Sequence, residues 1–144
     1  MRDLTKGLKK LHANKIVHLD IKSENILYSF SGKFKLADLG LACMLTNLSS
    51  SDISEGDSRY LAPELLQIMP EDSKTIPDLT KADIFSLGAT ILEIMRGKSL
   101  PKNGPEWHNI RDGYFEIKGK YSRRLKDTVK SMLHRDPASR PSAE

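Results

Sequence analysis

Apolar residues recur along this chain with two different periods, and the changes of period predict its elements. Near the amino terminus three leucines follow the spacing of an amphipathic helix: Leu4, Leu8 and Leu11. Two short apolar runs at 26–30 and 33–36 then surround Ser31-Gly32, a pair typical of a hairpin turn. Helical spacing returns over residues 81–95, and Gly97 provides a stop. The pattern predicts a mainly α-helical fold with a small β-hairpin element.

Two polar stretches interrupt this pattern and are predicted to be loops. Residues 44–58 combine acidic residues with five serines, Ser49, Ser50, Ser51, Ser54 and Ser58. The second stretch runs from Pro70 to Pro77. Phosphorylation of the serines is one interpretation, but a solvated loop is the favoured one.

The composition is that of a single domain. At 144 residues and 38% hydrophobic content, the chain has enough apolar side chains for a core. The net charge of +4 is mild, and Lys9-Lys10 and Arg123-Arg124 are the only basic doublets. We interpret the basic residues as solvated faces and expect no nucleic-acid partner.

The cysteine and histidine residues exclude two classes of site. Cys43 is the only cysteine, so no internal disulfide can form, and we expect a packed free thiol in a reducing, intracellular compartment. His12, His108 and His134 show no metal-ligand spacing with Cys43 or with one another, so no zinc site is assigned. No apolar run reaches the length of a transmembrane segment, and no signal peptide is visible.

The polar residues that carry the most chemistry flank the predicted hairpin. The run His18-Leu19-Asp20-Ile21-Lys22-Ser23-Glu24-Asn25-Ile26 precedes it, and Asp38-Leu39-Gly40 follows it. We expect the hairpin to fold Asp38 back beside Asn25. Two carboxylates, an ammonium and an amide would then share one site.

Such a site suits phosphoryl transfer from a magnesium nucleotide, in which the protein orients the acceptor and neutralises charge. Asn25 and Asp38 offer hard oxygen ligands for Mg²⁺. Asp20 can accept the proton of the incoming hydroxyl, and Lys22 can neutralise the migrating phosphate. A lone Asp-Leu-Gly is more often a simple turn, so the prediction depends on the whole combination in this order and spacing.

The pattern His-x-Asp-x-Lys-x-x-Asn, then Asp-x-Gly, then Ala62-Pro63-Glu64 resembles the signature set of protein kinases. The resemblance extends over the whole chain and implies a partial kinase domain at 1–144, the C-terminal lobe of an α+β two-lobe fold. It implies that Asp20 is the catalytic base and that Asn25 and Asp38 bind ATP through Mg²⁺. Lys22 is the other catalytic residue that we assign.

The same resemblance implies structural roles for residues outside the catalytic group. Arg140 is expected to be the buried ion-pair partner of Glu64, which ends the activation segment. Asp83 matches an acidic residue that braces the backbone of the catalytic loop. We expect His18 to form hydrogen bonds within the loop region, and Trp107 to pack against the lobe.

Further details resemble the Wee family of kinases. Leu19 replaces the usual arginine, Leu39 replaces the usual phenylalanine, and the segments 55–61 and 100–113 are distinctive. The resemblance implies an enzyme that inhibits a cyclin-dependent kinase, and so mitotic entry, by phosphorylating its tyrosine and, in one branch, also a threonine. Lys22 is instead typical of serine/threonine kinases, so the tyrosine acceptor rests on the resemblance alone. Without the arginine, no guanidinium at that position can clamp a phosphate of the activation loop.

The sequence does not contain the parts of a kinase upper lobe, namely the glycine-rich loop, the strand lysine and the helix glutamate. We therefore expect the chain to begin inside the helix before the catalytic loop, to expose apolar side chains on its upper surface, and to be inactive alone. Two hypotheses stay open: part of a Wee-like kinase, or a non-catalytic binding protein that acts as a decoy. For the kinase we expect the nucleus rather than the cytoplasm, with a location at internal membranes left open.

Overall fold

The computed structural model describes all residues except 47, 50–52, 55 and 68–75. Its helices are α1 (Arg2–Ala13), α2 (Leu79–Arg96), α3 (Pro105–Arg111) and α4 (Arg123–Met132), with short 3₁₀ turns at Ser23–Asn25, Pro63–Gln67 and Pro137–Ser139. Its strands are β1 (Ile16–Val17), β2 (Ile26–Tyr28), β3 (Phe34–Leu36) and β4 (Cys43–Met44). The predicted loops fall partly outside the described residues, and so do Ser50 and Ser51.

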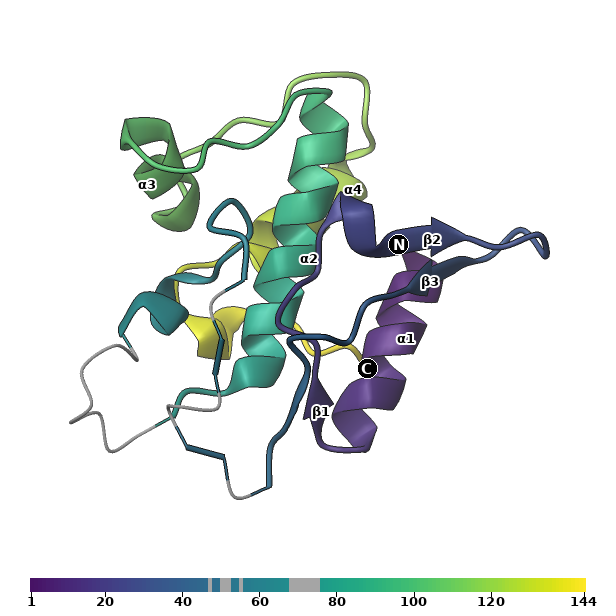
Figure 1. The fold of residues 1–144 in the computed structure, drawn as a ribbon. Helices are drawn as coiled ribbons and strands as arrows, with labels where there is room; N and C mark the ends of the chain where they lie inside the picture. Colours follow the sequence, from purple (N-terminus) through teal and green to yellow (C-terminus); the bar gives the residue numbers. More distant parts are fainter. Residues whose placement is uncertain (47, 50–52, 55, 68–75) are drawn as a thin grey trace.

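Helix α2 runs through the middle of the molecule, with α1 and α3 on opposite sides of it (Figure 1). Asp78 caps its amino end, where the carboxylate accepts a hydrogen bond of 3.0 Å from the backbone N–H of Thr80. Gly97 ends the helix in the left-handed conformation, with φ of 64°. The predicted helix over 81–95 and its glycine stop are confirmed.

Helix α4 packs directly on α2 at Gly88. A Cβ atom at Gly88 would lie 2.9 Å from the Cβ of Met132, so a larger residue would push the two helices apart. Ser122 caps α4 by accepting a hydrogen bond of 3.3 Å from the backbone N–H of Leu125. This close contact covers one side of α2.

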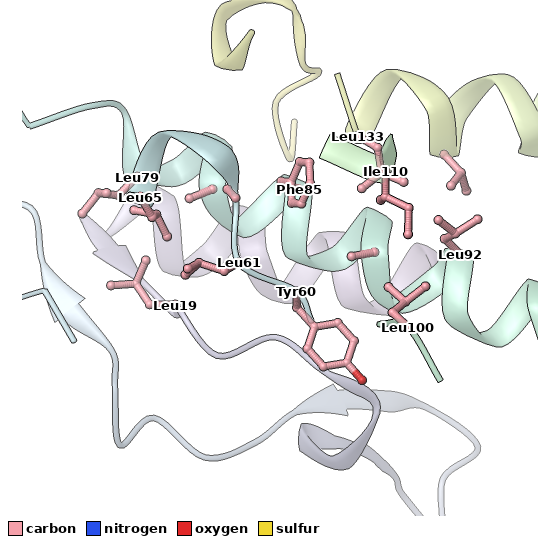
Figure 2. Packing of buried hydrophobic residues seen from close by; sticks show 14 of the residues in the cluster. Leu19, Tyr60, Leu61, Leu65, Leu79, Phe85, Leu92, Leu100, Ile110 and Leu133 are labelled. Atoms are coloured by element: carbon pink, nitrogen blue, oxygen red, sulfur yellow. The ribbon is translucent and has the colours of Figure 1, made fainter. Parts of the chain in front are cut away.

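Buried apolar side chains form two clusters around α2. The larger cluster joins α2 to α4 and to the segment that ends at the Pro63–Gln67 turn; Figure 2 labels Leu19, Tyr60, Leu61, Leu65, Leu79, Phe85, Leu92, Leu100, Ile110 and Leu133. The smaller cluster joins α1 to α2 through Leu4, Leu8, Ile21, Ile84, Leu87 and Met132. Because Leu4 and Leu8 are buried and Leu11 packs beside them, the predicted amphipathic helix is confirmed.

The strands form two small antiparallel sheets. Strands β2 and β3 make the predicted hairpin, with Ile26 opposite Leu36 and Tyr28 opposite Phe34. The first strand ends at Tyr28 and not at residue 30, because the backbone N–H of Ser29 already bonds to the carbonyl of Lys33 and closes the turn. The pairing of β1 with β4 was not predicted. It places Cys43 partly buried against the core, as expected of a packed thiol.

The hairpin projects from the rest of the molecule (Figure 1) and exposes large apolar side chains: Leu27, Tyr28, Phe30 and Phe34. Leu39 and Met44, which follow it in the chain, are also exposed. Apolar side chains are thus exposed on the hairpin and just after it. Within the described part of the chain, no helix combines the length and the apolar character that crossing a bilayer requires.

The predicted fold class is confirmed, since four α-helices and one hairpin account for most of the regular structure among the described residues. Helix α2 is the element that positions the rest. The loop after β1, the segment before the Pro63–Gln67 turn, and α4 all contact it.

Candidate active site

The loop between β1 and the hairpin is held by one buried carboxylate of α2. The oxygens of Asp83 accept hydrogen bonds of 2.9 Å from the backbone N–H groups of His18 and of Leu19. Asp83 is fully buried, and Nε2 of His12 donates to it across 2.8 Å. Leu19 takes a left-handed φ of 61° and buries its side chain in the core. The predicted bracing by Asp83 is confirmed, and His12 is a partner that sequence reasoning missed.

His18 links the two polar stretches of the site. Its Nδ1 accepts a hydrogen bond of 3.3 Å from the backbone N–H of Asp20, so Nε2 carries the ring proton and donates to the carbonyl of Ala37 across 3.1 Å. The side chain is completely buried. His18 therefore has the predicted structural role, and it ties Asp20 to the residue before Asp38.

Three of the predicted residues form one hydrogen-bonded group. Nζ of Lys22 lies 3.0 and 2.8 Å from the two carboxylate oxygens of Asp20, and this contact raises the pKa of Lys22. Nδ2 of Asn25 donates to the backbone carbonyl of Asp20 at 2.8 Å and to its Oδ2 at 2.9 Å. Asp20 is thus oriented from two sides.

Asp38 stands apart from this group. The backbone N–H of Ala37 bonds to the carbonyl of Asn25 at 2.9 Å, so the hairpin does return the chain to the neighbourhood of Asn25. The exposed side chain of Asp38, however, accepts a hydrogen bond of 3.0 Å from its own turn, at Gly40. Among the described residues, no hydrogen bond joins its carboxylate to Asp20, Lys22 or Asn25.

The donor atoms fit a magnesium ion that is shared with phosphate oxygens. Both contacts of the Asn25 amide are with acceptors, so its nitrogen faces Asp20 and its Oδ1 is left for a cation. Oδ2 of Asp38 likewise accepts no hydrogen bond from any described residue. Mg²⁺ binds through one or two protein oxygens with substrate phosphates and waters. No group of three or more His, Cys, Asp or Glu able to hold a metal occurs in the described ranges.

The segment 56–60 covers one side of the catalytic loop. A Cβ atom on Gly56 would lie 2.7 Å from the carbonyl oxygen of Leu19 and 3.4 Å from Oδ1 of Asp20. This close approach requires glycine. The segment 56–60 therefore lies directly against Leu19 and Asp20.

Arg59 fixes the same segment through ion pairs that sequence reasoning missed. Its guanidinium contacts the carboxylates of Asp57 at 2.6 Å, Glu24 at 3.2 Å and Glu93 at 3.9 Å. The hydrogen bonds from Arg59 hold the pKa of Asp57 below its usual value. Glu24 and Glu93 lie 35 and 34 residues away in sequence from Arg59, so local spacing gave no signal of the contact.

Tyr60 anchors the end of the segment on α2. Its hydroxyl donates to Glu93 across 2.6 Å, and its carbonyl accepts a hydrogen bond of 2.9 Å from the hydroxyl of Ser86. Burial raises the pKa of Tyr60. Beyond it, Arg140 and Glu64 form the predicted buried ion pair, with two parallel contacts of 2.6 and 2.8 Å. This pair is confirmed.

Comparison with known proteins gives matches that extend over nearly the whole chain. The family model for the protein kinase domain matches residues 1–144. A membrane-associated tyrosine- and threonine-specific cdc2-inhibitory kinase of Drosophila melanogaster is 46% identical over 145 residues, covering 99% of this chain and 26% of that protein. A Wee1-like protein kinase of Oryza sativa subsp. japonica is 40% identical over 141 residues, covering 98% of this chain and 25% of that protein.

A third relative, Wee1-like protein kinase 2 of Ailuropoda melanoleuca, is 39% identical over 161 residues, covering 95% of this chain and 27% of that protein. The chain thus spans about a quarter of the length of these relatives.

Proposed function

This chain belongs to the protein kinase family, and we propose that the complete protein transfers the γ-phosphoryl group of ATP to a hydroxyl of a protein substrate. The match confirms the resemblance to protein kinases, and the relatives confirm the resemblance to the Wee group. The observation that carries the proposal is the group formed by Asp20, Lys22 and Asn25, oriented by hydrogen bonds and held on the buried Asp83.

In the proposed reaction, the acceptor oxygen forms a bond to the γ-phosphorus as the bond from that phosphorus to the ADP oxygen breaks. The hydroxyl proton passes to the carboxylate of Asp20, which Lys22 and Asn25 orient. Lys22 also neutralises charge on the phosphoryl oxygens. Asn25 and Asp38 would hold Mg²⁺, which neutralises charge on the phosphates of ATP when bound.

The proposed substrate is a cyclin-dependent kinase, and the proposed effect is a delay of mitotic entry. This follows from the names of the relatives, one of which is described as a cdc2-inhibitory kinase specific for tyrosine and threonine. We propose acceptors of the same two kinds. The nucleus is the proposed location.

The arginine contacts of the segment 56–60 support activity without phosphorylation of that segment. In many kinases a phosphate on the activation loop recruits arginine and orders the loop. Here Arg59 already pairs with Asp57 and with Glu24 of the catalytic loop. Carboxylates of this chain thus hold Arg59 and its segment without a phosphate.

We propose that residues 1–144 alone do not transfer phosphate at a useful rate. Positioning of both substrates supplies most of the rate of phosphoryl transfer. Among the described residues, the exposed carboxylate of Asp38 is hydrogen-bonded only within its own turn. Residues 1–144 therefore do not hold Asp38 firmly enough to position a nucleotide by themselves.

The test is phosphoryl transfer by the complete protein from γ-labelled ATP to a cyclin-bound cyclin-dependent kinase, with the acceptor residue mapped by mass spectrometry. Asp20→Asn removes the proton acceptor and should lower kcat by about 100-fold or more. Asp38→Asn should abolish transfer at ordinary magnesium concentrations and recover partly when magnesium is raised.

Glu106→Gln is the matched control, because Glu106 is exposed on α3 and contacts Arg96 rather than the site. Transfer by the wild type, with both site variants inactive, supports the proposal. A wild-type protein that binds the cyclin-dependent kinase without transferring phosphate would contradict it and leave the non-catalytic binding hypothesis.

A further inference from the structure

One backbone carbonyl beside the active site receives two hydrogen bonds from α3. Nε1 of Trp107 donates to the carbonyl oxygen of Ser58 at 2.8 Å, and Nη2 of Arg111 donates to the same oxygen at 2.6 Å. Nη2 of Arg111 also lies 3.5 Å from the carbonyl of Arg59. Helix α3 therefore contacts the middle of the segment 56–60 through two donor side chains, those of Trp107 and Arg111.

The two side chains also hold each other. The guanidinium carbon of Arg111 lies 3.5 Å from the ring centroid of Trp107, and Nη1 donates to the carbonyl of Trp107 at 3.1 Å. The ring of Phe85 lies on another side of the guanidinium, at 5.8 Å. Both side chains are more than nine-tenths buried, so the sequence prediction that Trp107 packs against the lobe is confirmed.

The guanidinium of Arg111 is buried without a counter-charge among the described residues. No carboxylate of a described residue lies within ion-pair distance of it, and its Nε is a buried donor without a partner. Burial lowers its pKa to about 10. A buried cation without a counter-charge costs free energy, and this cost offsets the hydrogen bonds and the Trp107 contact that Arg111 makes. We therefore expect an apolar side chain of similar length to leave the stability nearly unchanged.

The contacted segment lies against the catalytic loop, where the acceptor of the proposed reaction would bind. Gly56 lies against the catalytic loop, and Tyr60 is fixed to α2 through Glu93 and Ser86. Ser58 lies between these two anchored points. Its hydroxyl donates to the carbonyl of Lys102, in the loop that leads into α3. The position of Ser58 therefore depends on α3.

We propose that Trp107 and Arg111 form a latch that positions residues 56–60 for the protein acceptor. Both are positioning residues, because they act through the Ser58 carbonyl and do not reach Asp20. The proposal rests on the proposed function, since it names the part of the fold that sets acceptor affinity. Release of the latch frees the segment while the catalytic loop stays braced by Asp83.

The first experiment tests the latch on residues 1–144, without any activity. Trp107 is the only tryptophan, so its fluorescence reports on this contact directly. Arg111→Met should shift the emission and should speed amide exchange at Arg59 and Tyr60 by about tenfold. The thermal midpoint should not fall. Glu106→Gln, on the exposed face of α3, should change neither signal.

A lower thermal midpoint together with unchanged exchange at Arg59 and Tyr60 would make Arg111 a merely structural residue and overturn the latch. Trp107→Phe retains an aromatic ring but loses the donor, and should give a smaller increase in exchange. The double variant leaves the Ser58 carbonyl with neither donor. It should exceed the sum of the two single effects, because each donor partly replaces the other.

The second experiment uses the complete protein. In Arg111→Met the KM for the protein acceptor should rise about tenfold, while kcat and the KM for ATP stay within about twofold of the wild type. Equal changes in all three constants would overturn the latch. If the wild type shows no transfer at all, the proposed function fails, and the exchange experiment on residues 1–144 still decides the latch.

Discussion

The two halves of the candidate site are built in different ways. The acceptor half, which we define as Asp20, Lys22, Asn25 and the segment 56–60, is held by buried hydrogen bonds to α2 and by partly buried ones to α3. The nucleotide half, Asp38 with the hairpin of β2 and β3, is exposed and bonds mainly to itself. Catalytic side chains need several independent contacts to be held in place. The acceptor half has them within this chain.

The largest expected effect comes from removing the frame of the acceptor half. Asp83→Ala leaves the backbone donors of His18 and Leu19 buried without partners, so the free energy of unfolding should fall by about 2–6 kcal/mol. Urea denaturation of residues 1–144 measures it. Asp127→Asn, at an exposed ion pair of α4, is the control and should change stability by less than about 0.5 kcal/mol. A loss below about 1 kcal/mol for Asp83→Ala would mean that the loop is not braced as described.

A methyl group at Gly56 should separate the segment 56–60 from the catalytic loop. Its Cβ would meet the Leu19 carbonyl at 2.7 Å, so Gly56→Ala should lower stability by about 1–3 kcal/mol. Gly7→Ala, in the interior of α1, is a matched control. The added Cβ would lie 3.6 Å from the side chain of Leu36 in β3, which is an ordinary van der Waals distance. That control should gain about 0.5–1 kcal/mol from helix propensity. Equal effects of the two changes would contradict the close contact.

The Asp57–Arg59 pair should make the acceptor half sensitive to acid. Arg59 lowers the pKa of Asp57, so the native state binds fewer protons than the unfolded state. The resulting stability of about 1 kcal/mol is present above about pH 4 and is lost as the pH falls below it. The stability difference between wild type and Asp57→Asn should therefore shrink as the pH falls below about 4. A difference independent of pH would contradict the pairing.

The smallest effect is expected in the nucleotide half. Asp38 is exposed, and asparagine tolerates its left-handed φ of 59°, so Asp38→Asn should change the free energy of unfolding by less than about 0.5 kcal/mol. The same denaturation experiment measures this. A loss comparable to that of Asp83→Ala would remove the distinction between the two halves.

The sequence predicted the elements whose signals are local. The hairpin follows from Ser31-Gly32 between apolar runs, and α2 follows from its apolar spacing and Gly97. The pairing of β1 with β4 could not be predicted, because strands of two residues are too short to show a period. The predicted boundaries differ most at the turn of the hairpin, where β2 ends at Tyr28 and β3 begins at Phe34. The bond from the backbone N–H of Ser29 to the carbonyl of Lys33 already closes the turn there. Helix α2 also begins two residues earlier and ends one residue later than the apolar spacing predicted.

Within the site, motif spacing identified the polar side chains but not what holds them. The His12–Asp83 contact joins residues 71 positions apart, and Arg59 reaches carboxylates on the catalytic loop and on α2. Such contacts depend on tertiary packing, which no local pattern encodes. The same holds for Arg111, whose spacing on α3 gives no sign that it contacts Ser58.

The most direct test of the difference between the halves is amide hydrogen exchange on residues 1–144. We expect the His18 and Leu19 amides, bonded to buried Asp83, to exchange only through global unfolding. The Gly40 amide, bonded to exposed Asp38, should exchange at least about 100-fold faster. Exchange at His18 and Leu19 as fast as at Gly40 would show that the acceptor half is not preformed, and would contradict the account.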